Sequence, residues 1–555
     1  MANLADIGLV YKGIRPLQKL GAQARDLAET LNYPLKRIRE EAPRHLLVVP
    51  PDPWAGDSQR GRDMIAGIFR FGGQTIARDS LSWEPLGAKP EWLYDLHSFE
   101  FLRDLRSVGG DRARRMAREM VASWLDHYVK LSGPTARPDI IGVRLSSWMS
   151  FHDFFCASAD DTFRESYFIS LVRQAKYLQR VLPGHLTGIS LMRALKGLAY
   201  SGLALEGGEE RLESAFRLIL REIRDQILPD GCHVSRNPQS TFEFLQILVD
   251  LRTALNAARL PMPDELQHAI DRIAPAVKFF RHGCGALAHF NGAQEGNPHI
   301  CDATLMHSGA RGKAMKSLPH GGFDKIYQGR AQVLMDIGLP PTAPKYSERA
   351  HAGLLSFEYS YGKDRVFVNC GSSPLKGTWR DMLRTTAAHT ALVVDCRNIF
   401  QLDDKGQLTE KVELTHRKSE DTRVALLEAS HTGYRTRLGL MHRRRLCLTD
   451  NGDVLSGEDT LAGRSGVPYT LRFHLHPAIQ ASLVQEGSEV LLRARSGMGW
   501  RFTAPGATLA LEESVHVSCG EAPRRTLQIV ISGVTASEND LRAWELKREK
   551  LAPSA

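Results

Sequence analysis

The sequence predicts a multidomain α+β protein in which a helical N-terminal part precedes an antiparallel β-sandwich. The chain has 555 residues, more than one compact core usually organises. From about residue 93 to residue 300, apolar residues recur every three or four positions, which is the period of amphipathic helices. From about residue 346 onward, short alternating segments follow one another between turns, which is typical of a β-sandwich.

Residues 1–92 are expected to form a non-catalytic cap or arm. A basic amphipathic segment from Leu17 to Leu31 predicts a helix, and proline-rich and strand-like pieces follow it. Asp6 stands where a signal peptide would be basic, and no long apolar stretch follows. We therefore expect a cytoplasmic location. Since no window of about 18 residues is free of charge, we also expect no membrane span.

Residues 93–300 are predicted to form a helical domain. Short turns such as Leu182-Pro-Gly184 join successive helices, which favours antiparallel helix hairpins. The period by itself leaves a bundle, a solenoid and a toroid open. The expected helices cover 93–107, 111–132, 144–157, 163–182, 187–204, 209–227, 239–258 and 263–280.

Residues 281–345 have little periodicity and are rich in glycine, histidine and proline. A stretch of this length without regular structure is usually functional in a compact protein. We expect it to form one wall of a cleft, with residues 301–345 as the junction between two domains.

The β-domain is predicted to span residues 346–545 and to begin with a hairpin. Apolar and polar residues alternate through Leu355, Phe357 and Tyr359 before a Tyr-Gly-Lys-Asp turn. Later strands are expected at 391–396, 423–429, 442–448, 469–475, 489–495, 500–502 and 527–532.

The bulk composition limits the classes of binding partner to be expected. With 43% hydrophobic and 24% charged residues, the chain has the composition of an ordinary globular protein. A net charge of +9 gives weak support to a polyanionic partner. Nucleic acid is not favoured, because no predicted strand interleaves basic residues with stacking aromatics. The eight cysteines form no C-x-x-C pair, so we expect reduced thiols, without a disulfide framework or a thiolate metal site.

Three short motifs at the start of the β-domain resemble, in order, the C-terminal β-domain of the heparinase II/III family of polysaccharide lyases. The matching residues are His351, Ser356 and Phe357, then Val368, Asn369 and Gly371, then Arg384, Thr386, Ala388, His389 and Thr390. The resemblance covers roughly residues 90 to 540. It implies an incomplete α/α toroid ahead of the β-sandwich.

The resemblance also implies eliminative cleavage of an acidic polysaccharide, such as a glycosaminoglycan containing uronic acid. The C5 proton of a uronic acid is hardly acidic until the carboxylate beside it is neutralised. Such a site therefore needs a cationic or amide group at the carboxylate, a base for C5 and an acid for the leaving oxygen. A basic cleft between a toroid and a sandwich would supply them.

The helical part contributes three of the four catalytic candidates. His185 falls where family members tend to carry an Asn-His pair that holds the substrate carboxylate, although a lone histidine at a helix start is more often a cap or surface residue. Arg236 and Asn237 precede a predicted helix, whose free N–H groups favour an anion. The alternative for this segment is an ordinary Asn-Pro helix start. Ser240 stands near the slot of the family's catalytic tyrosine.

The fourth catalytic candidate is Arg349, which replaces the first histidine of the family's His-x-His. An arginine cannot act as a neutral base, but it can clamp a carboxylate. His233, Asn291 and Arg384 are the candidate substrate-binding residues. We expect a histidine, in place of a tyrosine, to act as the base.

Some members of the heparinase II/III family hold a zinc ion in this part of the β-domain, so the resemblance also implies a structural zinc ion. The counterparts of its ligands are His351, Asn369 and His389. Asn369 replaces an aspartate, so the anionic ligand is lost and the site is poor for zinc. The alternative, which we favour, is that the two histidines bridge strands by hydrogen bonds.

A second hypothesis is a catalytically silent glycan-binding protein that acts in producing or sensing an envelope polysaccharide. The residues Ser240, Arg349, Asn369 and Met382 motivate it, because each departs from the family pattern. The sequence leaves open the sugar, endo or exo action, and whether the protein is a homo-oligomer. The lyase hypothesis predicts that His185, Arg236, Asn237 and Arg349 converge on one cleft.

Overall fold

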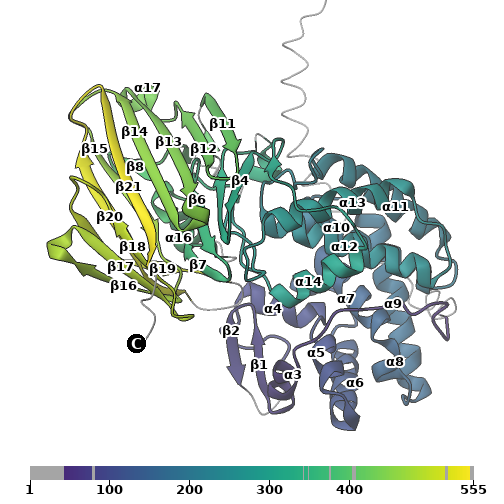
Figure 1. Cartoon of the computed structure of the whole chain (residues 1–555). Helices are drawn as coiled ribbons and strands as arrows, with labels where there is room; N and C mark the ends of the chain where they lie inside the picture. The colour runs from purple at the N-terminus through teal and green to yellow at the C-terminus, as the bar shows by residue number, and fades with distance from the viewer. Residues whose placement is uncertain are drawn as a thin grey trace, which may run out of the picture. The chain divides into compact units, whose positions relative to one another are not determined.

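The structure is a computed structural model that describes residues 43–77, 82–341, 343–347, 349–373, 377–402, 408–409, 411–518 and 523–549. The chain divides into two compact units. The first unit takes the described residues up to 223 together with 247–266, and the second takes 224–246 together with the described residues from 267 onward. Helices build the first unit and antiparallel sheets dominate the second, so the predicted fold class is confirmed (Figure 1). The helix expected from Leu17 to Leu31 lies outside the described residues.

The first unit begins with a small helix and a hairpin, followed by helices joined by short turns. The hairpin pairs β1 (Ile68–Phe71) with β2 (Gln74–Ala77). The helices are α3 (Ser58–Ile65), α4 (Pro90–Ser98), α5 (Leu102–Val108), α6 (Gly110–His127), α7 (Pro138–Ser150), α8 (His152–Cys156), α9 (Asp161–Val181) and α10 (Gly188–Ala204). Two further helices, α11 (Glu209–Gln226) and α12 (Pro238–Ala257), each contain a boundary between the units.

Helix α7 forms the centre of the first unit, because almost every residue along it is buried. Gly142 of α7 and Gly197 of α10 meet where the two helices cross, so that a Cβ on Gly142 would lie 2.4 Å from the Cα of Ala194. Arg144 is fully buried and bonds Gln174 and two backbone carbonyls. A buried arginine is tolerated here because its donors are satisfied.

Each of the eight predicted helical segments contains helix, but the segments at 93–107 and 144–157 are each split into two helices, and several ends differ. The segment predicted at 144–157 begins earlier, at Pro138, since proline suits the first turn of a helix. The segment predicted at 93–107 is two helices, and Phe99 between them adopts a left-handed conformation with φ of 60°. Among the described residues, no helix combines the length and the apolar character needed to cross a bilayer.

Among the described residues, the second unit contains three large antiparallel sheets and a two-stranded sheet of β9 (Gln401–Leu402) and β10 (Leu408–Thr409). The eight-stranded sheet has the order β11 (Leu414–Glu420), β12 (Ala425–His431), β13 (Leu440–Thr449), β14 (Val454–Gly463), β21 (Asn539–Glu549), β18 (Gly499–Thr503), β17 (Glu489–Ala494), β16 (Ile479–Val484). The four-stranded sheet has the order β19 (Leu509–His516), β20 (Arg524–Val534), β15 (Pro468–His474), β8 (Leu392–Val394). The five-stranded sheet runs from β3 (Ser317–Leu318) through β4 (Phe323–Gln328), β5 (Ala331–Asp336) and β6 (Phe357–Tyr361) to β7 (Asp364–Phe367).

Aromatic side chains from all three large sheets meet in one core. Trp544 of β21 stacks on Phe357 of β6 at 5.8 Å between ring centroids and meets Phe473 of β15 edge-on at 4.8 Å. Such contacts add to the hydrophobic gain from burying the rings. The strands expected from alternation therefore form a sandwich around this core.

Two expectations for the second unit need correction. The stretch 281–345 is not free of regular structure, since it contains α14 (Pro298–Ser308) and strands β3 to β5. The hairpin formed by β6 and β7 turns where predicted, but all five residues of β6 are buried. Its polar residues Glu358 and Ser360 therefore face a second buried layer, in which both bond His282.

Candidate functional site

Asn291 connects several of the predicted site residues in the second unit. It lies in the loop after α13 (Asp264–Phe279) with φ of 48°, a value that asparagine tolerates better than most residues. Its Oδ1 accepts a hydrogen bond from the backbone N–H of His351 at 3.3 Å. Its Nδ2 donates to the carbonyl of Arg236 and to Asp336, both at 3.3 Å. The predicted substrate-binding residue Asn291 is therefore buried and fixed at both ends of its amide.

Asn237 joins this group as the cap of α12. Its Oδ1 accepts from the backbone N–H of Ser240 at 3.0 Å, and its Nδ2 donates to the carbonyl of Asn291 at 2.9 Å. The first contact is the ordinary helix start that was the alternative reading of this segment. The second places Asn237 beside the Asn291 loop, where it is 4% exposed.

Arg236 is placed differently from what a carboxylate clamp requires. Its guanidinium is buried, pairs with Asp336, and donates to the carbonyls of Gly321 at 2.7 Å and Gly322 at 3.0 Å. It also lies 4.8 Å from the ring centroid of Phe323. In this structure Arg236 therefore ties the start of α12 to the five-stranded sheet.

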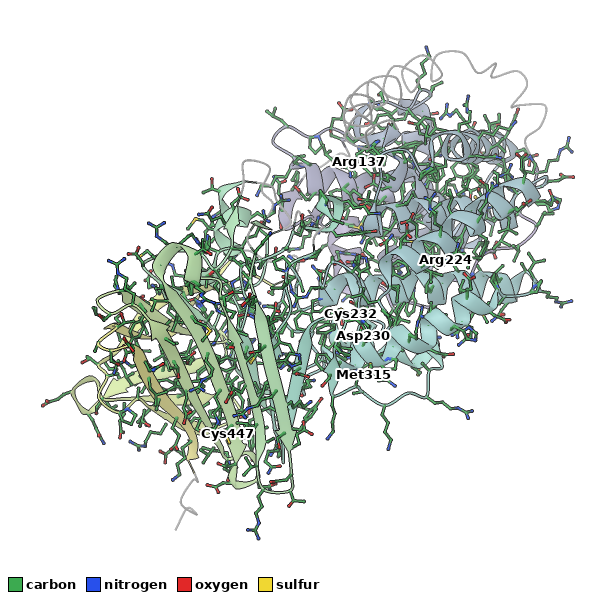
Figure 2. The ribbon with its side chains drawn as sticks, turned by 90° about the horizontal axis from the view of Figure 1, so that it is seen from above. Arg137, Arg224, Asp230, Cys232, Met315 and Cys447 are labelled. Carbon is green, nitrogen blue, oxygen red and sulfur yellow. The ribbon has the colours of Figure 1, made fainter. Side chains whose placement is uncertain are left out.

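The loop before Arg236 is held in the same way. Asp230 accepts hydrogen bonds from the backbone N–H groups of His320 and Gly321, both at 2.8 Å, and from that of Cys232 at 3.1 Å (Figure 2 labels Asp230 and Cys232). His233 bonds Gln226 through Nε2 at 2.9 Å, and its Nδ1 accepts from the N–H of Ser235. Burial lowers the pKa of His233 to about 3, so it is neutral at pH 7.

His351 and His389 form a directly bonded pair, with 3.0 Å between His351 Nδ1 and His389 Nε2. His389 Nδ1 lies 2.7 Å from the carbonyl of Thr385, which can only accept. His389 must therefore carry its proton on Nδ1, and its Nε2 accepts from His351 Nδ1. This order leaves the lone pair of His351 on Nε2, the nitrogen able to take up a proton.

Both imidazoles are neutral at pH 7. Burial, together with the nearby His389 and Arg384, lowers the pKa of His351 well below its usual range. Burial lowers the pKa of His389 to about 4, although the hydrogen bond to Thr385 acts in the opposite direction. Two neutral rings are what the hydrogen-bonded pair requires.

The three residues proposed for zinc do not fit the ion. Asn369 donates to the carbonyl of His289 at 3.0 Å and accepts from the N–H of Thr390 at 3.0 Å, so both ends of its amide are engaged. The facing nitrogens of His351 and His389 are bonded to each other. The set also lacks an anion, which leaves the hydrogen-bonded alternative as the arrangement that the structure shows.

Arg349 and helix α16 (Thr378–Leu383) supply an exposed surface beside the histidine pair. Arg349 is exposed, and its backbone lies against Gly292, where a Cβ would come within 3.1 Å of the Arg349 carbonyl. Arg384 is buried and donates to the carbonyls of Ala350 at 2.9 Å and Ser347 at 3.4 Å. Arg384 therefore holds the segment that carries Arg349 and His351.

Helix α16 also presents two large exposed side chains, Trp379 at 48% and Met382 at 57%. The cation of Arg380 on the same helix lies close enough to His351 to lower its pKa. An exposed tryptophan beside cations is a common way to bind a sugar ring that carries an acidic group. The sequence motifs do not point to Trp379, because motif spacing carries no information about the exposure of a neighbouring side chain.

Tyr346 is a second residue to which the sequence motifs do not point. It lies in α15 (Pro344–Ser347), and its ring meets the ring of His233 edge-on at 6.0 Å between centroids. The chain thus has a tyrosine on the segment leading to Arg349, although none stands in the loop where the family carries one. The signal was its spacing of five residues from His351, at the edge of the expected junction.

His185 belongs to the first unit, where it is an exposed residue between α9 and α10. Arg236, Asn237 and Arg349 belong to the second unit. The predicted convergence of all four residues on one cleft stays a prediction.

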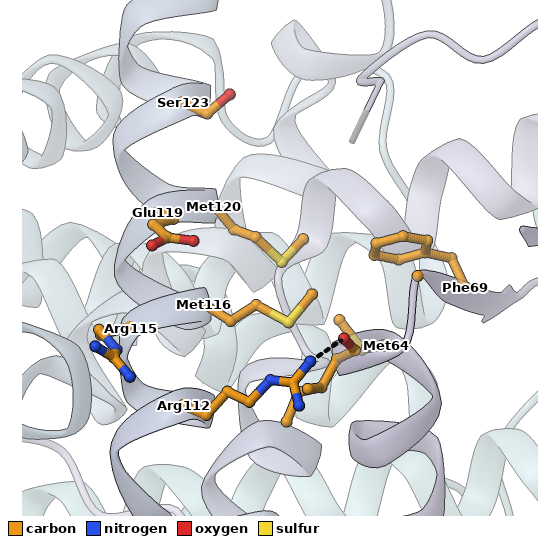
Figure 3. A pocket seen from close by; sticks show the side chains of 10 residues that line it. Met64, Phe69, Arg112, Arg115, Met116, Glu119, Met120 and Ser123 are labelled. Atoms are coloured by element: carbon orange, nitrogen blue, oxygen red, sulfur yellow. Dashed lines mark hydrogen bonds between the residues drawn. The ribbon is translucent and has the colours of Figure 1, made fainter. Parts of the chain in front are cut away.

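The first unit has a cavity of about 520 Å³ between α3, the first strand and α6. Figure 3 shows the side chains of Met116 and Met120 directed toward Phe69, with Arg112 at one end donating to the carbonyl of Ile65 at 3.4 Å. No residue of the predicted site lines this cavity. The lining also carries Glu119 and two arginines, but because none of the predicted site residues reaches it, we do not place the chemistry there.

Comparison with known proteins finds a family match within the second unit. Residues 310–545 match the family described as heparinase II/III-like, C-terminal. The chain carries a heparinase II/III-like C-terminal domain. A crystal structure of heparinase III is similar over 93% of this chain and 88% of that chain, with a TM-score of 0.69 and 13% identity. A mutant of the heparan sulfate lyase HepC from Pedobacter heparinus is similar over 94% and 89%, with a TM-score of 0.61 and 13% identity.

At this level of identity the solved structures establish the fold, and they confirm the toroid-plus-sandwich architecture that the motifs implied. The chain also has a sequence relative that spans nearly its whole length. FtsZ-localized protein C of Caulobacter vibrioides (strain NA1000 / CB15N) is 29% identical over 98% of this chain and 96% of its own length. That name states a location with FtsZ and no substrate.

Proposed function

We propose that this protein cleaves an acidic polysaccharide or oligosaccharide containing uronic acid by β-elimination, with His351 as the base. The observation that carries the proposal is the fixed proton order of the histidine pair. Because the Thr385 carbonyl sets the tautomer of His389, His351 keeps its lone pair on Nε2. A neutral imidazole with a defined lone pair is suited to remove the C5 proton.

The remaining roles fall to residues on the same segments. Arg349 is exposed and, with Arg380, would neutralise the uronate carboxylate, which makes the C5 proton acidic enough to remove. Trp379 would stack on a neighbouring sugar ring. Tyr346 is the candidate acid for the leaving oxygen, a role that a phenol can serve. Asn291 and Arg384 hold these segments in place through their bonds to the backbone.

The test is the ultraviolet absorbance of unsaturated uronate ends. We expect the purified protein to form them from at least one glycan in a panel of heparan, alginate and bacterial exopolysaccharide types. His351→Ala should lower the rate by about 10²–10⁴-fold, since that is the usual contribution of a general base. Arg417→Ala, on the exposed face of β11, is the control and should leave the rate unchanged. A wild-type protein that is inactive on the whole panel, or an active His351→Ala variant, would contradict the proposal.

A second candidate is a glycan-binding protein without turnover that acts in envelope polysaccharide production or sensing. Two observations favour it: the low pKa of His351, which weakens it as a base, and the relative named for its location with FtsZ. In this case glycans would bind to the wild-type protein without forming unsaturated ends. Arg349→Ala would then weaken binding, while His351→Ala would change it little. The two candidates therefore differ in whether any product appears.

A further inference from the structure

The loop that carries Asn291 also carries a second group of polar side chains. His289 and Glu295 come from this loop, and His516 comes from the end of β19. One donor atom from each of the three lies within 4.8 Å of the others. Glu295 Oε1 is 2.9 Å from His516 Nε2 and 4.0 Å from His289 Nε2.

His289 presents a buried nitrogen without a hydrogen-bond partner. Its Nδ1 lies 3.2 Å from the carbonyl of Asn369, so the proton sits on Nδ1 and the lone pair on Nε2. Its Nε2 has no hydrogen bond to any described residue, and the side chain is fully buried. A histidine whose Nδ1–H is held by a carbonyl while its Nε2 points at a carboxylate has the arrangement of a metal ligand.

The spacing of the donors suits one small cation. Two ligands about 2.0–2.1 Å from a tetrahedral zinc ion are about 3.4 Å apart. The two separations from Glu295 Oε1, 2.9 and 4.0 Å, lie on either side of that value, so changes of about 0.5 Å and about 0.6 Å would let Glu295 share an ion with each histidine. Two histidines and a carboxylate are also a donor set that favours a transition metal over calcium or magnesium.

The charged groups around the cluster are compatible with a bound cation. Arg365 Nη1 bonds Glu295 Oε1 at 2.7 Å, and Arg365 Nη2 lies 3.7 Å from Glu358. One guanidinium thus faces two carboxylates. A carboxylate oxygen can accept more than one partner, so Arg365 can remain bonded to Glu295 while the carboxylate binds a metal.

His476 is also near, with Nε2 at 3.7 Å from Glu295 Oε1, but it is not a ligand in our assignment. Its Nδ1 accepts a hydrogen bond from the N–H of Ala478 at 3.2 Å, so the neutral ring carries its proton on Nε2. That proton points at Glu295. His476 therefore supports the carboxylate from outside, and the three protein ligands leave one position for water.

We propose that His289, Glu295 and His516 bind one divalent transition-metal ion, with Zn²⁺ as the best fit. The site differs from the one that family resemblance implied at His351, Asn369 and His389. It would join the loop after α13 to the end of β19, two segments more than two hundred residues apart in the sequence. Because Asn291 lies two residues after His289, the ion would also help to hold the loop that contacts His351.

The test measures metal content and does not depend on turnover. The full-length protein is loaded with Zn²⁺, dialysed and analysed by mass spectrometry of the metal, where we expect about one equivalent per chain. Loading with Co²⁺ should give the strong visible absorption of a four-coordinate site. His289→Ala and His516→Ala should each reduce bound metal at least about tenfold, since outer partners alone cost 10–100-fold in affinity.

Two further variants keep the test decisive. His431→Gln is the control for the loss of a buried imidazole. His431 bonds His442, which in turn bonds Asp459, and none of these residues is a proposed ligand. This variant should therefore keep the metal. His476→Gln keeps an N–H donor on the side chain next to Glu295, so it should lose much less metal than His289→Ala or His516→Ala. Wild-type protein without bound Zn²⁺ or Co²⁺, or His289→Ala protein that retains a full equivalent, would overturn the proposal. Because the metal content is measured directly, the result would stand even if the protein proved to have no lyase activity.

Discussion

At the scale of single residues, one buried carboxylate of the β-sandwich, that of Asp459, accepts hydrogen bonds from three side chains. Asp459 of β14 accepts from Arg444 at 2.7 Å and from His442 at 2.8 Å through Oδ1, and from the indole of Trp544 at 3.1 Å through Oδ2. Arg444 and Asp459 are direct partners across β13 and β14. Burial opposes ionisation of Asp459, but Arg444 and His442 outweigh it and lower the pKa to about 2.

Asp459→Asn should therefore destabilise the sandwich strongly at pH 7. Removing one member of a buried pair leaves Arg444 uncompensated, which costs about 3–5 kcal/mol. The loss should appear as a lower urea midpoint for the β-sheet signal in circular dichroism. Glu458→Gln, one residue earlier and half-exposed, is the control and should change stability by no more than about 0.5 kcal/mol.

The cost of Asp459→Asn should shrink in acid. An unfolded aspartate titrates near pH 3.9 and the folded one near pH 2, so the unfolded chain binds more protons between these values. The stability that this carboxylate contributes is complete above about pH 4 and falls as the pH drops toward 2. Urea midpoints of the wild type and the variant should thus converge over this range. A difference that stays constant from pH 7 to pH 2 would contradict the assignment.

At this scale the sequence predicts residue types better than partners. The sequence favours a hydrogen-bonded role for His351 and His389 over zinc binding, and their rings are bonded directly to each other. Arg236 was expected to face a ligand, yet its guanidinium pairs with Asp336, one hundred residues away in the sequence. No local pattern reports such a partner, since the contact exists only after the sheet has formed.

At the scale of elements, the crossing of α7 and α10 depends on the absence of side chains. Gly142→Ala would normally gain up to about 1 kcal/mol, because alanine favours a helix more than glycine does. Here the added Cβ would lie 2.4 Å from the Cα of Ala194 and 2.6 Å from the carbonyl of Arg193. Backbone must move to admit it, so we expect a net loss of about 1–3 kcal/mol. The sign of the change in melting temperature decides between these effects, and a stabilised variant would show that the helices do not cross here.

Helices and strands were predicted well where the apolar repeat extends over many residues, and poorly where it is short. The helices from α9 to α13 agree with their predicted spans to within two residues, because each repeats its apolar face over several turns. Strands β3 to β5 were missed in the stretch rich in glycine and histidine. Their residues are buried on both faces for most of their length, so they lack the alternation that marks a half-buried strand.

At the scale of the whole molecule, the folding unit is larger than the family match. The heparinase II/III-like match begins at residue 310, whereas the second unit also contains residues 224–246 and 267–309. Those earlier residues supply partners for two buried carboxylates of the sheet. Arg236 pairs with Asp336, and His282 bonds Glu358 at 2.7 Å.

A fragment of residues 310–549 should therefore fold poorly, although it contains every strand of the sandwich from β3 to β21. Without the earlier segment, Asp336 and Glu358 would be buried without their partners, at a cost of several kcal/mol each. A fragment of residues 224–549 restores Arg236, His282 and the His289 loop. We expect it to show a cooperative thermal transition and protection from trypsin, while the shorter fragment binds a hydrophobic dye and is digested. Equal melting temperatures for the two fragments would show that the sandwich needs no help from the helical segment, and that these buried pairs contribute little to its stability.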